Sequence, residues 1–311
     1  MIDAKAAAAG STTAWQDKTW QSADGLALHY RDYAGPDGRD EIPAICVPGL
    51  TRNTRDFDEL ARHLAMRRRV ISVDLRGRGD SEYAKDVGTY NPVQYAQDLL
   101  LLFPAAGIER AVIIGSSLGG LVTMLMARIA PERIAGAVIN DIGPVIESRG
   151  LDRIGEYVGI QRTYPTWMHA ARALQETRGE SYPEWTIADW LAESKRVMEL
   201  GNNGRITFDY DMRIGDGFAS GPGKAAVAEE TQADLWAGYD ALAGRPVLVV
   251  RGEHSDILSA RTALEMAGRF SGAELVGVPR VGHLPLLTEP EAIAAIDRLF
   301  EERLPSNRAA R

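Results

Sequence analysis

Ser117 is the residue whose type and setting best suit catalysis. The run AVIIGSSLGGLVTML places an apolar, strand-like segment directly before Gly115-Ser116-Ser117-Leu118-Gly119, and a helical pattern follows at once. G-x-S-x-G between a strand and a helix is typical of a serine nucleophile on a strained turn. Glycine two residues to either side lets neighbouring backbone approach closely. The sequence therefore predicts that Ser117 is a nucleophile.

A serine hydroxyl needs a base to accept its proton, and the base needs an acid that orients it. Among the five histidines, His283 follows the last predicted strand, and open parallel sheets place their functional groups at the carboxyl ends of strands. Asp256 follows the preceding strand and completes the chain order serine, acid, histidine. Asp141, after the strand that ends at Ile139, is the rival acid. We favour Asp256, because Asp141 also fits the role of a capping residue.

The negative charge that develops during attack needs backbone N–H donors, which leave no signature in side-chain type. Leu118, the residue after Ser117, is the first expected donor. The turn Pro48-Gly49-Leu50, which follows the third predicted strand, is expected to supply the second from the amide of Leu50.

Alternating strands and helices position these residues. Such alternation predicts an α/β protein with a mostly parallel central sheet flanked by helices. The predicted strands are Trp15–Gln21, Leu26–Asp32, Ala44–Val47, Val70–Val73, Ala111–Ile114, Ile134–Ile139, Val247–Val250 and Glu274–Val278.

The alternation lapses in the middle of the chain, where helical stretches occur and no strand is predicted. We expect residues 1–14 to be a flexible tail and residues 15–144 and 245–311 to form one core. Residues 145–244 are then a helical insert into that core.

Composition excludes several classes of protein. Lys and Arg number 35 against 43 Asp and Glu, so the net charge is −8 and nucleic-acid binding has no electrostatic support. No apolar run reaches 18 residues, so no membrane span is expected. The single Cys46 excludes an internal disulfide and a cysteine-rich zinc site. The start of the chain, with Asp3 and Lys5, does not fit a secretory signal, and a cytoplasmic location is expected.

Taken together, these motifs resemble the α/β-hydrolase fold superfamily over nearly the whole chain, from about Trp20 to Leu304. The resemblance implies that the insert is a helical cap over the active site. The insert holds 11 of the 22 aromatic residues, which could line a pocket or form the cap's own core. The matching motifs are Pro48-Gly49-Leu50, Asp74-Leu75-Arg76-Gly77-Arg78-Gly79-Asp80-Ser81, GSSLGG, Gly252-Glu253-His254-Ser255-Asp256 and Gly282-His283.

Serine in the G-x-S-x-G motif resembles esterases, lactonases and C–C bond hydrolases of this superfamily. We expect a serine hydrolase that cleaves a small to medium apolar ester or lactone, with a small-molecule substrate and with neither cofactor nor metal. Relatives that cleave C–C bonds often have asparagine before the serine and tryptophan soon after the histidine. Ser116 and Leu284-Pro285-Leu286 stand there instead. Three alternatives are left open: C–C bond hydrolysis or other non-ester chemistry of a serine–histidine pair on the same fold, a ligand-binding module, and assembly into a homo-oligomer.

Overall fold

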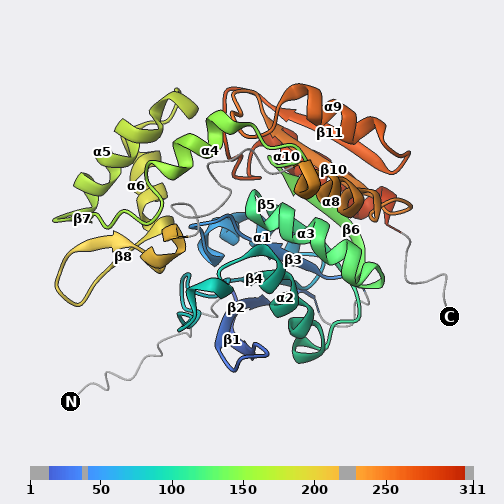
Figure 1. Cartoon of the computed structure of the whole chain (residues 1–311), viewed down its shortest axis with the longest axis horizontal. Helices are drawn as coiled ribbons and strands as arrows, with labels where there is room; N and C mark the ends of the chain where they lie inside the picture. Colours follow the sequence, from blue (N-terminus) through green and yellow to red (C-terminus); the bar gives the residue numbers. More distant parts are fainter. Residues whose placement is uncertain (1–13, 37–40, 217–228, 305–311) are drawn as a thin grey trace, which may run out of the picture.

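The computed structural model describes residues 14–36, 41–216 and 229–304. Figure 1 shows a twisted sheet covered by helices, with a smaller body beside it. The predicted tail, residues 1–14, lies outside the described residues except for Ala14. In the described part of the chain, no helix is both long and apolar enough to span a membrane.

An eight-stranded sheet forms the core. Its strands are β1 (Gln16–Gln21), β2 (Ala27–Tyr33), β3 (Ala44–Val47), β4 (Val70–Val73), β5 (Ala111–Ser116), β6 (Ile134–Asn140), β10 (Val247–Gly252) and β11 (Ala273–Val278). Their order is β1-β2-β4-β3-β5-β6-β10-β11. β2 pairs antiparallel with β1 and β4, and every pair from β4 to β11 is parallel. The predicted α/β fold with a mostly parallel sheet is therefore confirmed.

Helices cover both faces of this sheet (Figure 1). The side chains of successive strand residues point to opposite faces of the sheet. Each buried strand therefore contributes side chains to two hydrophobic clusters, one on each face. In β3, Ile45 and Val47 face one cluster, whereas Ala44 and Cys46 face the other. Cys46 is thus a small, buried core residue. The first cluster packs against α2 (Pro92–Ala106), α3 (Leu118–Ile129), α8 (Glu229–Asp240) and α9 (Ala260–Gly268), and the second against α1 (Asp58–Ala65) and α10 (Pro290–Arg298).

The start and end of α2 follow from its sequence. The side chain of Asn91 accepts a hydrogen bond from the amide of Gln94 at 2.9 Å, and Pro92 occupies the first helical position, where its missing N–H costs nothing. Gly107 ends the helix with a φ of 65°, a conformation that glycine adopts without steric cost.

The insert contains strands as well as helices, so the prediction that it has no strand is wrong. Its helices are α4 (Ser148–Gly155), α5 (Trp167–Arg178) and α6 (Ile187–Val197), and its strands are β7 (Thr163–Tyr164), β8 (Met198–Leu200) and β9 (Ile206–Phe208). These strands form an antiparallel sheet in the order β7-β9-β8. Each has only two or three residues, which is too short for a period-two pattern to show.

The predicted end of the insert at residue 244 is also too late. Helix α8 belongs to the core, because the Tyr239 hydroxyl donates to the carbonyl of Met266 in α9 at 2.9 Å. Gly238 lies against the backbone of Met124 in α3, where a Cβ would come within 2.6 Å of the carbonyl oxygen. A helical pattern shows that a helix forms, but it does not show which body the helix packs against.

Aromatic residues build the insert's own core. The rings of Tyr182 and Trp185 stack with centroids 4.2 Å apart, and Trp190 meets Trp185 edge-on at 4.7 Å. Trp190 and Tyr182 are buried together with aliphatic residues of α5, α6 and β9. Such aromatic pairs add to the stability of this small core.

A buried imidazole makes the stability of the core depend on pH. His29 of β2 lies 2.7 Å from Asp74 and 3.0 Å from Asp17. Burial lowers the pKa of His29, but the hydrogen bonds to Asp74 and Asp17 and the charges of Asp74 and Asp80 outweigh it, so the pKa lies above its ordinary value.

We expect the imidazolium of His29 to stabilise the fold fully below its unfolded pKa of about 6.5, and less as the pH rises through the higher folded pKa. Urea unfolding between about pH 6 and about pH 9 tests this. The free energy of unfolding of the native protein should fall relative to that of His29→Gln as the pH rises. A constant difference between the two proteins would contradict the assignment.

Candidate active site

Ser117 lies on a strained turn between β5 and α3. Its φ is 51° and its ψ is −114°, a left-handed conformation that is costly for any residue with a side chain. A Cβ on Gly119 would overlap the carbonyl oxygen of Val47, and a Cβ on Gly115 would overlap the carbonyl oxygen of Gly119. Both glycines are therefore required by close backbone contact, as the motif predicted.

Gly119→Ala should lower the free energy of unfolding by about 3 kcal/mol, because backbone atoms of β3 must move to admit the methyl group. Gly268→Ala is the matched control, since nothing lies within 4 Å of its added Cβ. It should raise the stability by about 0.5 kcal/mol through the better helix propensity of alanine. Urea denaturation measures both. Equal stability of the two variants would contradict the tight packing of the turn.

His283 connects Ser117 to a carboxylate. Its Nε2 lies 2.9 Å from Ser117 Oγ, and its Nδ1 lies 2.8 Å from Asp141 Oδ2. A carboxylate only accepts hydrogen bonds, so Nδ1 carries the proton and Nε2 is free to accept the serine hydroxyl. The loop after β11 thus places His283 where the sequence predicted a base.

The acid that contacts His283 is Asp141, and the choice of Asp256 over Asp141 is corrected by this geometry. Asp141 directly follows β6, which lies between β5 and β10 in the sheet. Its side chain is fully buried, and Oδ1 accepts from the amide of Gly252 at 2.9 Å. Its own amide donates to the carbonyl of Val250, so two hydrogen bonds to the backbone of β10 hold Asp141 beside His283.

Asp256 forms a two-pronged ion pair with Arg153 of the insert. The distances are 2.6 Å from Nε and 2.9 Å from Nη2. Burial raises the pKa of Asp256, but the hydrogen bonds and charge of Arg153 and the charge of His283 lower it further, so the pKa lies below its ordinary value. Asp256 therefore serves as a counter-ion for an arginine of the insert.

Residues of the insert hold the loop that carries His283. The Tyr182 hydroxyl donates to the carbonyl of Leu284 at 2.8 Å and accepts from the Leu284 amide at 2.7 Å. The amide of Gly282 donates to the carbonyl of Ser181 at 2.6 Å. Both neighbours of His283 are thus fixed by the insert. Nothing in the sequence pattern pointed to Tyr182 in this role.

The two residues whose backbone amides are expected to face a developing negative charge line the cavities at Ser117. Leu118 is the first residue of α3, where an amide has no acceptor within its own helix. Leu50 lines the same cavities as Ser117. Its carbonyl accepts from Nε of the buried Arg78 at 2.9 Å, which holds the turn after β3 in place.

Two cavities meet at Ser117. The larger is apolar, has a volume of about 480 Å³ and is lined by Leu118, Leu121 and Ile142 of the core. The insert adds aliphatic rather than aromatic side chains to it, namely Ile146, Leu151, Ile154 and Ile214. The smaller cavity, which we call the polar pocket, has a volume of about 50 Å³. It is lined by Ser117 and His283 and by the insert residues Arg153, Tyr157, Arg178 and Tyr182.

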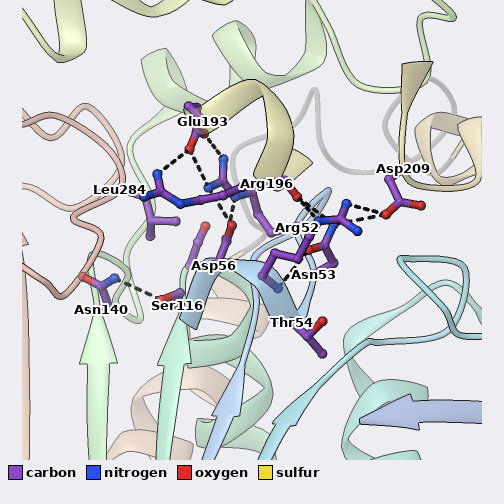
Figure 2. A network of polar contacts seen from close by, with 12 residues as sticks. Arg52, Asn53, Thr54, Asp56, Ser116, Asn140, Glu193, Arg196, Asp209 and Leu284 are labelled. Carbon is purple, nitrogen blue, oxygen red and sulfur yellow. Dashed lines mark hydrogen bonds and ion pairs between the residues drawn. The ribbon is translucent and has the colours of Figure 1, made fainter. Parts of the chain in front are cut away.

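A buried polar network fastens the insert to the core beside this pocket (Figure 2). Arg52, in the loop after β3, pairs with Asp56 at 2.6 Å and also contacts Glu193 of α6. Arg55 reaches Asp209 at 2.5 Å. Figure 2 also shows Asn140, whose amide donates to Ser116 Oγ at 3.0 Å. Removing one partner of a buried ion pair is costly, so this network holds the insert firmly against the core.

Within the described ranges, one group of side chains has the spacing of metal ligands, His29 with Asp74 and Asp80. Asp74 already accepts from His29, from the amide of Thr54 at 2.6 Å and from the amide of Asp80 at 3.1 Å. These bonds take three of the roughly four lone-pair sites of the Asp74 carboxylate, and the two ring nitrogens of His29 already lie beside Asp74 and Asp17. The group lines neither cavity at Ser117.

Comparison of the chain with known proteins shows the family to which it belongs. Residues 44–296 match the family model described as the alpha/beta hydrolase family. The chain is 34% identical to a 3-hydroxybutyrate-oligomer hydrolase of Cupriavidus necator, over 82% of this chain and 87% of that protein. It is 28% identical to the 2-(acetamidomethylene)succinate hydrolase of Mesorhizobium japonicum, over 78% of this chain and 82% of that protein.

A solved structure gives the same result. The crystal structure of an alpha/beta hydrolase from Novosphingobium aromaticivorans has a TM-score of 0.86 and 56% identity, and the match covers 93% of this chain and 98% of that one. The chain belongs to the alpha/beta hydrolase family, which confirms the resemblance seen in its motifs. It is an enzyme of that class, a hydrolase.

Proposed function

We propose that the protein is a serine hydrolase that cleaves a small to medium aliphatic carboxylic ester or lactone through an acyl-enzyme. The observation that carries the proposal is the hydrogen-bond chain from Ser117 through His283 to Asp141, with distances of 2.9 and 2.8 Å. These distances are short enough for proton transfer from the serine to the imidazole. The strained turn on which Ser117 lies suits the same role.

The reaction follows from these positions. Ser117 Oγ attacks the ester carbonyl while Nε2 of His283 takes its proton, and Asp141 stabilises the imidazolium that forms. The amides of Leu50 and Leu118 stabilise the negative oxygen of the tetrahedral intermediate. His283 then returns the proton to the leaving alcohol. A water molecule, activated by His283, hydrolyses the acyl-enzyme and frees Ser117.

The apolar cavity supports an aliphatic acyl group. Its lining is mostly apolar, with leucine and isoleucine predominating over Tyr90, Asn91 and Tyr95, which favours a hydrocarbon chain. Its volume of about 480 Å³ leaves room for a chain of moderate length. The curated relative from Cupriavidus necator is a hydrolase of oligomers of 3-hydroxybutyrate, whose units are joined by ester bonds. This supports an ester of a short aliphatic acid over other acyl compounds.

Hydrolysis of p-nitrophenyl esters from acetate to laurate, together with several lactones, tests the proposal. We expect turnover to rise from acetate to hexanoate and to fall for laurate, because the cavity is finite. Ser117→Ala is the control for background hydrolysis. If the folded protein hydrolyses none of these compounds, ester hydrolysis is wrong and C–C bond cleavage becomes the leading alternative.

A further inference from the structure

The polar pocket beside Ser117 has an unusual balance of charge. Three arginines line it, Arg52, Arg153 and Arg178, and none of the described residues that line it is an aspartate or glutamate. The carboxylates that pair with these arginines do not line the pocket; they are Asp56, Glu193 and Asp256. The face turned toward Ser117 therefore carries hydrogen-bond donors and positive charge.

The three guanidinium groups differ in how many of their nitrogen atoms already donate a hydrogen bond to a carboxylate. Arg52 is occupied, since Nε, Nη1 and Nη2 all donate to Asp56 or Glu193. Arg153 donates to Asp256 through Nε and Nη2, so its Nη1 is the nitrogen that does not bond to this carboxylate. Arg178 has a single contact to Glu193, at 3.5 Å through Nη1. Within the described residues, its Nε and Nη2 have no hydrogen-bond partner.

Tyr157 lies among these donors. The guanidinium carbon of Arg178 is 5.2 Å from the centre of the Tyr157 ring, and Tyr157 lines the polar pocket together with Arg153. The side chains of Arg153 and Arg178 are 27% and 15% exposed, so both are largely shielded from bulk water. In such surroundings, hydrogen bonds from arginine to a carboxylate are strong and geometrically selective.

The size of the pocket limits what it admits. Its volume of about 50 Å³ corresponds to about four water-sized groups. A carboxylate with one or two carbon atoms fits such a space, whereas a long chain belongs in the apolar cavity.

The position of His283 decides which half of the ester enters the polar pocket. His283 lines the polar pocket and is not part of the lining of the apolar cavity, whereas Leu118 lines only the apolar cavity. The leaving alcohol must lie next to the imidazole that protonates it. The alcohol half therefore occupies the polar pocket, and the acyl chain occupies the apolar cavity.

We infer that the polar pocket is a carboxylate subsite, in which Arg178, Arg153 and Tyr157 bind a free carboxylate carried by the alcohol half of the substrate. This inference rests on the proposed function. The substrate class is then an aliphatic acyl ester of a short hydroxy acid. The acyl C–O bond breaks, the acyl group passes to Ser117 and then to water, and the hydroxy acid leaves with the proton from His283. An oligomer of hydroxy acids would be cut at the ester nearest its free carboxylate.

A matched pair of substrates tests the subsite. One is the O-hexanoyl ester of glycolate as the free acid, and the other is the same ester with a primary amide in place of the carboxylate. The two have the same scissile bond and nearly the same shape. We expect kcat/KM to be about ten- to a hundredfold higher for the acid, the effect of hydrogen bonds to a charged group.

Arg178→Gln should reduce this preference for the acid to about threefold or less, mainly through KM, because it removes the guanidinium that has the fewest other partners. Arg172→Gln is the matched control, since Arg172 lies exposed on the same helix and lines neither cavity. It should keep the full preference. If Arg178→Gln fails to fold, Arg178→Lys and Tyr157→Phe test the same donors and should each weaken the preference.

The outcomes separate this inference from the function on which it rests. Hydrolysis of the acid and the amide with equal kcat/KM, by a protein that also hydrolyses p-nitrophenyl esters, overturns the carboxylate subsite and leaves the esterase intact. A preference for the acid that survives in Arg178→Gln overturns the role of Arg178. Failure of the folded protein to hydrolyse any of these esters overturns the esterase and the subsite together.

Discussion

Asp141→Asn should lower kcat for a p-nitrophenyl ester by about ten-thousandfold, the loss that follows when the orienting carboxylate of such a site becomes an amide. The reason is the proton on Nδ1 of His283. Asp141 accepts it at 2.8 Å and opposes the positive charge that forms on the imidazole. The asparagine amide can donate to Nδ1, which favours the tautomer that cannot accept the proton of Ser117.

Asp256→Asn is the matched comparison, because Asp256 also follows a strand of the sheet and also carries its charge close to His283. Its carboxylate is bound to Arg153 rather than to the imidazole. We expect it to cost at most about tenfold in kcat. Unfolding curves of both variants serve as the control for folding, since Asp141 also accepts from the amide of Gly252. A large loss in Asp256→Asn with a small one in Asp141→Asn would restore Asp256 as the acid.

Ser117→Ala should lower kcat by about a millionfold, the largest effect expected for a single substitution, because the covalent route is lost. A residual rate above that of water is expected from the backbone amides of Leu50 and Leu118 and from substrate binding. Steady-state kinetics with highly purified variant measures the loss. An esterase activity that survives within tenfold would show that another group attacks the ester.

Ser117→Gly distinguishes the loss of the nucleophile from the relief of backbone strain at residue 117. It should be as inactive as Ser117→Ala but more stable than Ser117→Ala by about 1 kcal/mol. Glycine adopts the φ of 51° without steric cost, whereas alanine does not. Urea denaturation compares the two variants. Equal stability would mean that the turn stores no strain at Ser117.

The features that the sequence predicted well are those whose physical causes are local. The turn at Ser117 depends on glycines two residues away, and the start of α2 depends on Asn91 and Pro92. The strands of the sheet were found because buried parallel strands are short apolar runs.

The acid at His283 could not be chosen in this way. Asp141 and Asp256 both follow apolar strands, and chain order alone does not tell how strands are ordered in a sheet. Two contacts decide between them, and both come from tertiary structure. β6 lies next to β5, so Asp141 at the end of β6 and Ser117 at the end of β5 can both contact His283. Arg153 of the insert binds Asp256 instead.

The insert was predicted least well for related reasons. Strands of two or three residues, such as Thr163–Tyr164, carry no detectable pattern and form only because a neighbour is present. Its contributions to the site, Tyr182 on the loop of His283 and Arg178 in the polar pocket, depend on how it docks on the core. Docking is not encoded in any one stretch of residues.

Covalent labelling with a fluorophosphonate tests the central claim most directly, because this reagent reacts with a serine only when a neighbouring base and oxyanion donors activate it. The proposed mechanism predicts one adduct per chain by intact mass, mapped to Ser117 by peptide sequencing. It also predicts loss of esterase activity in step with labelling, no adduct in Ser117→Ala and slower labelling of Asp141→Asn. A folded protein that stays unlabelled while it hydrolyses esters, or an adduct on a different serine, would contradict the assignment of Ser117 as the nucleophile.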